Sequence, residues 1–208
     1  MDKLIHNLYS AYTQLNEQLF NNELPEPIII IQSNQYSPKS KKTVTGWCTT
    51  SPVWEQNIND KKDYKYEINL IAEYLDRGYE GIMETLLHES CHLHNICNHI
   101  EDCSSRGKHN EHFKEECDRI NLLCEKVPRH GWAKTTLSPH LIEVVNNLEV
   151  DKEAFKIYRI VEVKEKKTRN VAPTHKYKCN SCGHEISSKE DELIVICKDC
   201  NKEYTQIK

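Results

Sequence analysis

The chain has 208 residues, of which 38% are hydrophobic and 29% are charged, and its formal net charge at pH 7 is −4. This balance is ordinary for a soluble globular protein and argues against extended disorder. A chain of this length can bury one sizeable core and carry a small extra module. The negative net charge gives no overall attraction to nucleic acid, and the apolar runs are too short to span a membrane.

The first residues, MDKLIHNLYSAYTQL, have the pattern of an amphipathic helix rather than a signal peptide. We therefore expect a cytoplasmic protein. Ten cysteines are present, and in a reducing compartment they are expected to be free thiols or zinc ligands rather than disulfides.

Hydrophobic periodicity predicts the elements in chain order. They are a helix over 2–20, a buried strand over 27–31, a polar turn over 37–42, strands over 44–48 and 66–71, a helix over 78–97, a polar segment over 98–108, and helices over 109–125 and 139–148. Ser138 is the expected N-cap of the last helix. This order predicts an α+β domain in which a small sheet packs on the helix over 78–97.

His88, Glu89 and His92 form an HExxH pattern within that helix. Positions i and i+4 share one helix face, so both imidazoles can bind one metal ion. A glutamate next to the first histidine can accept a proton from water, which is the arrangement of zinc-dependent hydrolases. An ordinary helix with two polar histidines is the alternative. The largely apolar surroundings disfavour it, because a buried imidazole needs a partner.

A catalytic zinc ion usually takes three protein ligands. His94 lies about 200° around the helix from His92 and therefore points away. The residues that the sequence leaves open as third ligand follow in the next segment: His109, Glu111, His112, Glu115 and Glu116.

Near the C-terminus, two CxxC pairs stand 14 residues apart, at Cys179, Cys182, Cys197 and Cys200. This spacing predicts a closed structural zinc site with four thiolate ligands, a zinc ribbon. A module of this size cannot fold on its own core, so the metal is expected to supply the folding energy. Gly183 suits the turn after the second cysteine because glycine tolerates positive φ. The other six cysteines are expected to be core or surface thiols.

The chain resembles the SprT-like family of zinc metalloproteases in four segments, at 8–25, 68–70, 84–92 and 107–113. The resemblance implies a zincin-like domain over 1–150 and a ribbon over 175–208, with one catalytic and one structural zinc ion. Matching Phe113 to the family's phenylalanine makes His109 the third ligand and Glu89 the catalytic base. Asn110 stands where the family usually has glycine, so His112 remains the alternative ligand.

The resemblance also implies that the enzyme is an endopeptidase with a protein substrate, bound on or crosslinked to DNA. The ribbon is linked with DNA contact in this family, and Tyr177, Lys176, Lys178 and His184 are candidates for it. A basic stretch in the segment 151–174 between the domains could touch phosphates or could be a solvated linker or edge strand: Lys164, Lys166, Lys167 and Arg169. Glu190, Asp191 and Glu192 would repel phosphates.

Two rival functions use the same residues. One is a non-peptidase zinc hydrolase built on the same histidines. The other is a nucleic-acid-binding or scaffold protein in which both zinc sites are structural.

Overall fold

The computed structural model describes residues 1–33, 44–160 and 173–207. It divides into two compact units, residues 1–161 and 162–208, which are treated separately below. The predicted turn over 37–42 and the basic stretch from Lys164 to Arg169 lie outside the described residues. In the part that is described, no helix combines the length and apolar character needed to cross a membrane.

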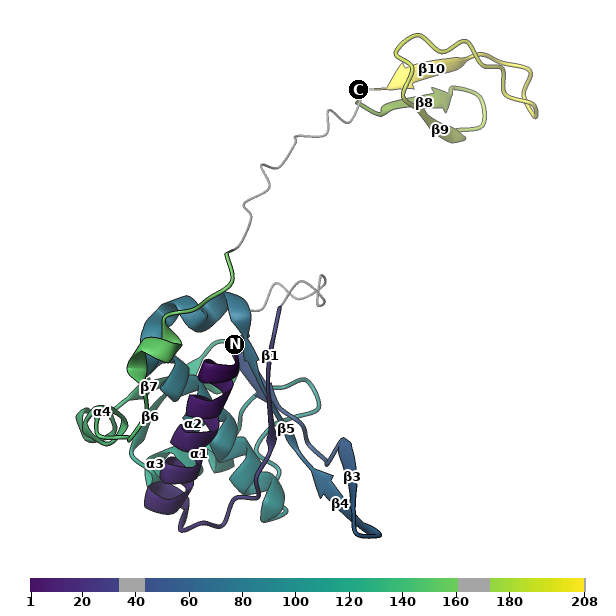
Figure 1. Ribbon diagram of the computed structural model, residues 1–208. Helices are drawn as coiled ribbons and strands as arrows, with labels where there is room; N and C mark the ends of the chain where they lie inside the picture. The colour runs from purple at the N-terminus through teal and green to yellow at the C-terminus, as the bar shows by residue number, and fades with distance from the viewer. Residues whose placement is uncertain (34–43, 161–172, 208) are drawn as a thin grey trace. The chain divides into compact units, whose positions relative to one another are not determined.

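The first unit is built on a small mixed sheet (Figure 1). Strand β5 (Glu67–Ile71) lies between β1 (Ile28–Gln32), which is parallel to it, and β2 (Gly46–Cys48), which is antiparallel. Ile68, Leu70 and Ile71 of β5 are buried. We expected β1 to be wholly buried, but only Ile29 is, because β1 lies at an edge of the described sheet.

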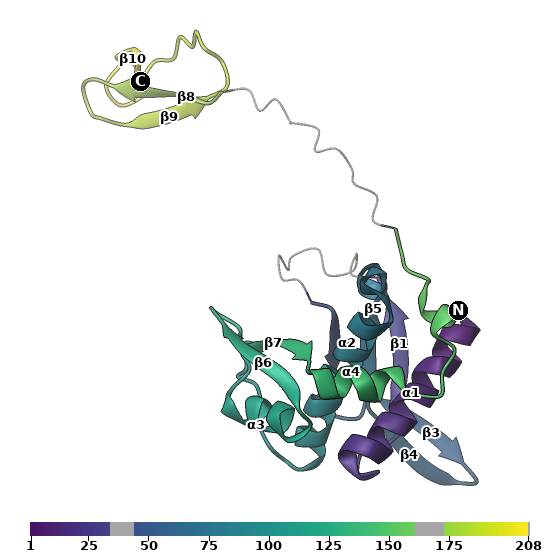
Figure 2. The same cartoon turned by 90° about the vertical axis from the view of Figure 1, so that its left-hand side faces the viewer.

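Helices α1 (Asp2–Phe20) and α2 (Gly78–Cys97) begin and end where the sequence predicts. A 3-10 helix, η2 (Ala72–Arg77), joins β5 to α2. Helix α2 contacts β2, β5 and α3 (Glu111–Arg119). Figure 2 shows the hairpin of β6 (Leu122–Val127) and β7 (Gly131–Leu137) on one side of α2, with α1 on the other. The described chain is therefore a mixed α+β structure in which α2 is central.

The helix predicted over 109–125 is wrong after residue 119. The chain turns at Asn121, which has a left-handed φ of 63°, and continues into β6, which pairs antiparallel with β7. Leu122 is buried while Leu123 is exposed, so the side chains alternate as in a half-buried strand. A second hairpin, β3 (Trp54–Ile58) and β4 (Lys61–Lys65), was also not predicted.

Helix α4 (Pro139–Asn146) starts at the predicted cap, where Ser138 Oγ accepts a hydrogen bond from Leu141 N at 3.1 Å. It ends two residues earlier than expected. A 3-10 helix, η3 (Lys152–Phe155), follows. Phe155 is buried in the core of the first unit, with its ring 5.0 Å from that of Tyr79. Residues 151–155, which we assigned to the linker, thus pack on the first unit.

The second unit is a three-stranded antiparallel sheet in the order β10-β8-β9. The strands are β8 (His175–Cys179), β9 (Glu185–Ser188) and β10 (Tyr204–Ile207). Its buried apolar side chains are Tyr177, Cys179, Cys197 and Tyr204. So small a core agrees with the expectation that a metal is needed to stabilise the unit.

Phe155→Ala is expected to lower the free energy of unfolding of the first unit by about 3–5 kcal/mol, because it leaves a cavity among buried side chains. Urea unfolding followed by tryptophan fluorescence measures this unit alone, since Trp47, Trp54 and Trp132 all belong to it. Tyr158→Ala is the matched control, because Tyr158 is 54% exposed. Equal stability of the two variants would contradict the packing of Phe155.

Candidate metal centres

Helix α2 places His88 and His92 one turn apart, with ring centroids 5.0 Å from each other. Buried residues on the same helix, including Leu86, Leu87 and Cys91, hold it in the core. The two imidazoles are half-buried. Their separation follows from the helical repeat, which brings i and i+4 onto one face.

His109 reaches the same point from the loop before α3. Its backbone N–H donates to His130 O at 3.0 Å, and its carbonyl accepts from Trp132 N at 3.3 Å. His130 lies in the turn of the β6–β7 hairpin, and Trp132 is the second residue of β7. Gly131 lies against His109 with a φ of 70°, and a Cβ there would come within 1.9 Å of His109 O. The hairpin therefore fixes the backbone that carries His109, and this needs glycine at 131.

Asn110, the departure from the family pattern, is the N-cap of α3. Its φ of −102° needs no glycine, and its side chain accepts hydrogen bonds from the backbone N–H groups of His112 and Phe113. Its amide nitrogen also donates to Glu101 O at 2.7 Å. An asparagine is thus well suited to start this helix.

The Nε2 atoms of the three histidines converge. Nε2 of His109 lies 3.2 Å from Nε2 of His88 and 3.1 Å from Nε2 of His92. Two nitrogens that bind one zinc ion at about 2.0–2.1 Å with a tetrahedral angle are about 3.3–3.4 Å apart. The three histidines therefore form a group that could hold one metal ion.

The other ring nitrogen of each histidine faces a hydrogen-bond acceptor. His92 Nδ1 lies 2.7 Å from Asp102 Oδ2, His109 Nδ1 lies 3.4 Å from His130 O, and His88 Nδ1 lies 3.2 Å from Thr135 Oγ1. If each Nδ1 carries the proton, three Nε2 lone pairs point at one another. That arrangement is unfavourable unless a cation lies between them, and such outer partners are usual for metal-bound histidines.

Phe113 packs under the three imidazoles, with its ring centroid 4.4–4.7 Å from each of theirs. It is fully buried. The apolar base and the burial of the histidines disfavour imidazolium. Burial lowers the pKa of His88 well below its usual value, and it lowers the pKa of His109 to about 4. His88 and His109 are thus held in the neutral form that binds metal.

Glu89 follows His88 on α2 and is only 4% exposed. Burial raises the pKa of its carboxyl to about 7, and the backbone N–H of Cys48 on β2 partly offsets this effect. Gly46 on the same strand leaves space for the Glu89 carboxylate, since a Cβ at position 46 would lie only 3.2 Å from Glu89 Oε1. Strand β2 therefore packs closely beside the carboxylate, which is suited to proton transfer near neutral pH.

The remaining candidates for third ligand lie elsewhere. His112 is exposed and lies 3.3 Å from Glu115 Oε2, and the metal-ligating group found among the described residues does not include it. His94 lies between two carboxylates, with Nδ1 2.9 Å from Glu116 and Nε2 3.1 Å from Glu23. It links α2 to α3 and to the segment that follows α1.

Asp102, Thr135 and Gly131 support the site and were not singled out from the sequence. Asp102 comes from the loop after α2, and the other two come from a hairpin that the sequence did not reveal. Cys103 also lies near His92 and Asp102, but burial raises the pKa of its thiol to about 12, which disfavours the thiolate. Cys48, Cys91, Cys97, Cys117 and Cys124 are free thiols that are buried or half-buried.

The second unit brings together Cys179, Cys182, Cys197 and Cys200, whose sulfur atoms all lie within 4.8 Å of one another. Cys182 Sγ and Cys197 Sγ are 3.6 Å apart. The backbone N–H groups of Cys200 and Asp199 lower the pKa of Cys197 to about 6, whereas hydrogen bonding with the neighbouring cysteines raises the pKa of Cys182 to about 12. A bound cation would favour the thiolate form of both.

Two similar turns carry the four cysteines. Gly183 N donates to Cys179 O at 2.8 Å, and Asn201 N donates to Cys197 O at 2.9 Å. Both Gly183 and Asn201 have positive φ, which was predicted for Gly183 alone. The four cysteines thus form a group that could hold a metal ion as a zinc ribbon does.

The SprT-like family model matches residues 8–131. This is more than half of the chain, so the protein belongs to the SprT-like family, and the resemblance seen in the sequence is confirmed. The match includes the three histidines and Glu89 and ends before the four cysteines. No curated protein and no solved structure matches the chain. Family membership indicates a metallopeptidase-like function.

Gly131→Ala is expected to abolish metal binding by the three histidines, because its methyl group would displace the His109 backbone. The metal content of the purified full-length protein should be lower by one ion per chain than that of the unsubstituted protein. Gly107→Ala is the control: Gly107 also has a positive φ, of 68°, but a Cβ there meets nothing within 4 Å. An equal metal content in the two variants would contradict the role assigned to the contact with His109.

Proposed function

We propose that the chain is a zinc-dependent endopeptidase with a zincin-like catalytic domain. The observation that carries this proposal is the convergence of three imidazoles on one point, beside a buried glutamate. Three protein ligands leave a fourth position free, as catalytic rather than structural zinc sites do.

His88, His92 and His109 would hold the zinc ion, which when bound supplies Lewis-acid chemistry that polarises a carbonyl and acidifies water. Glu89 accepts a proton from the attacking water and passes it to the leaving amine, so the peptide bond is exchanged for a carboxyl group and an amine. Burial raises the pKa of Glu89, which favours the protonated form that holds the proton between the two transfers. Asp102 keeps His92 in the tautomer whose Nε2 is free for the metal.

Glu89→Gln is expected to reduce cleavage of an unfolded protein substrate by at least about 100-fold, because the amide cannot accept the proton. The variant should retain two zinc ions, since Glu89 is not among the proposed ligands. Cleavage is measured by gel or mass spectrometry and zinc by elemental analysis, with Glu115→Gln on the exposed face of α3 as the matched control. Undiminished proteolysis by Glu89→Gln would exclude this mechanism.

The same experiment separates the proposed peptidase from both rival functions. A non-peptidase hydrolase and a binding or scaffold protein with structural zinc alone would both leave every protein substrate intact, so Glu89-dependent proteolysis would exclude them.

DNA is the proposed partner that brings the enzyme to its protein substrate. Support comes from the family resemblance and the basic stretch at 164–169, with Lys176 and Lys178 on β8 as further candidates. Tyr177 is buried and its hydroxyl donates to Glu190 O at 2.6 Å, so stacking on a base is not available to it as placed. His184 Nδ1 is 2.7 Å from Tyr204 OH.

Full-length protein should bind single-stranded DNA with an affinity that falls as salt rises. Replacing Lys164, Lys166, Lys167 and Arg169 by glutamine should reduce the slope of log affinity against log salt by up to about 3, since each neutralised phosphate contributes about 0.7. Fluorescence anisotropy at four salt concentrations measures the slope. A flat salt response of the unsubstituted protein would remove DNA as a partner.

A further inference from the structure

The Nδ1 atom of His88 faces a residue of strand β7, whereas the Nδ1 atoms of His92 and His109 face residues outside the strands. Its Nδ1 lies 3.2 Å from Oγ1 of Thr135, in the middle of β7 and 47 residues further along the chain. Thr135 is 9% exposed. A buried hydroxyl needs hydrogen-bond partners, and this one has two.

The second partner is a carboxylate on α2. Thr135 Oγ1 donates to Glu84 Oε1 at 3.1 Å, and Glu84 precedes His88 by one helical turn. A hydroxyl has one proton. Because that proton goes to Glu84, the oxygen faces His88 as an acceptor, and His88 must donate its Nδ1 proton. The direction of the hydrogen bond from Thr135 to Glu84 therefore determines the direction of the hydrogen bond between His88 and Thr135.

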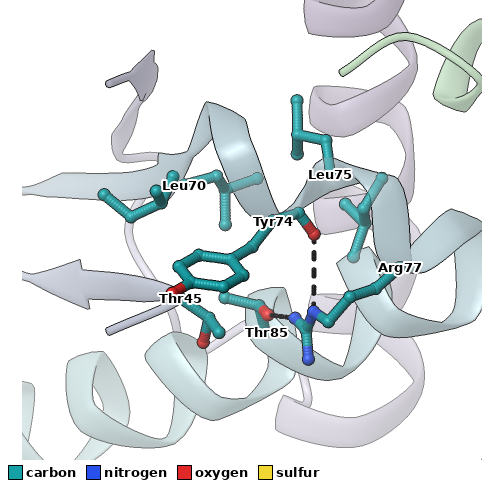
Figure 3. A pocket seen from close by; sticks show the side chains of 8 residues that line it. Thr45, Leu70, Tyr74, Leu75, Arg77 and Thr85 are labelled. Carbon is teal, nitrogen blue, oxygen red and sulfur yellow. Dashed lines mark hydrogen bonds between the residues drawn. The ribbon is translucent and has the colours of Figure 1, made fainter. Parts of the chain in front are cut away.

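Burial raises the pKa of Glu84, and Arg77 offsets part of that rise by favouring the carboxylate. Its Nη1 lies 3.9 Å from Glu84 Oε2, and a nearby positive charge favours a carboxylate. Figure 3 shows its guanidinium directed at Thr85 and at the carbonyl of Tyr74, beside a small hollow between β5, η2 and α2. The same group donates to Gly81 O at 2.6 Å. Arg77 is thus anchored to the first turns of α2.

We propose that Thr135 and Glu84 are positioning residues for the metal centre. Acting in series, they hold His88 as the Nδ1–H tautomer, so that its Nε2 faces the metal together with those of His92 and His109. The inference rests on the proposed function in one respect, namely that the histidines bind zinc. Asp102 does for His92 directly what Glu84 does for His88 through a hydroxyl.

Thr135→Val removes the hydroxyl and nearly preserves the shape of the side chain. We expect the zinc affinity of the histidine site to fall about 10–100-fold, the range typical for loss of an outer partner. Thr135→Ser should restore it, because serine keeps the hydroxyl. Competition of full-length protein against a chromogenic chelator measures the affinity, and the zinc held by the four cysteines serves as an internal reference that should not change.

Thr136→Val is the matched control, since Thr136 is the next residue on β7 and is exposed. Unfolding of the metal-free proteins by tryptophan fluorescence should give the same midpoint for the valine and serine variants at 135. Wild-type zinc affinity in Thr135→Val would overturn the proposal. So would a loss of affinity that Thr135→Ser fails to restore, because the effect would then come from packing.

The test of the positioning role and the test of the peptidase activity can succeed or fail independently. A weakened histidine site in Thr135→Val would support the positioning role even if the wild-type protein cleaved no protein substrate. Conversely, a peptidase that depends on Glu89 and keeps its zinc affinity in Thr135→Val would retain its function and refute the positioning role. In an active enzyme loaded with saturating zinc, we expect the variant to lower kcat while KM stays within about twofold, because the substrate contacts are untouched.

Discussion

The histidine centre of the first unit forms only if the imidazole of His109, which comes from a loop, lies against those of His88 and His92 on helix α2. His88 and His92 share a face of α2 by the helical repeat alone. His109 comes from a different segment, and its position requires backbone pairing with the β6–β7 hairpin and packing on Phe113. The Nε2 atoms of His88 and His92 both lie within 3.2 Å of Nε2 of His109. Such a grouping is costly when it is empty, so the surrounding structure must hold the three rings in place. A cation at their centre would turn that cost into binding free energy.

A metal ion would contribute differently to stability at the cysteine centre and at the histidine centre. The four cysteines lie in a small unit with few buried side chains, where a metal would replace the missing core. The histidine centre lies against the large core of the first unit, which can fold around α1, α2 and the sheet. A metal there adds chemistry rather than most of the folding energy. This division agrees with a closed set of four thiolates in one unit and an open set of three imidazoles in the other.

The sequence predicted the parts whose information is local. The ends of α1 and α2, the cap at Ser138 and the pairing of cysteines by two tight turns all follow from short-range patterns. The hairpins were missed because their signals are weak. Asn121 looks like a polar position in a helix until its left-handed φ is known. Strand β6 begins with three consecutive apolar residues, Leu122, Leu123 and Cys124, so its sequence does not alternate as a half-buried strand usually does. Asp102 and Thr135 could not be selected, because their importance arises only when distant segments come together.

The β6–β7 hairpin supplies none of the three imidazoles, yet it provides the carbonyl of His130, the bare backbone of Gly131 and the hydroxyl of Thr135 that surround them. The HExxH motif thus carries only part of the information that the centre needs. A related chain could keep every histidine and the glutamate and still have lost its metal through a single change in this hairpin. Inactive relatives would then be recognised by what stands at 131 and 135, and an intact HExxH would be a poor guide to which members are enzymes.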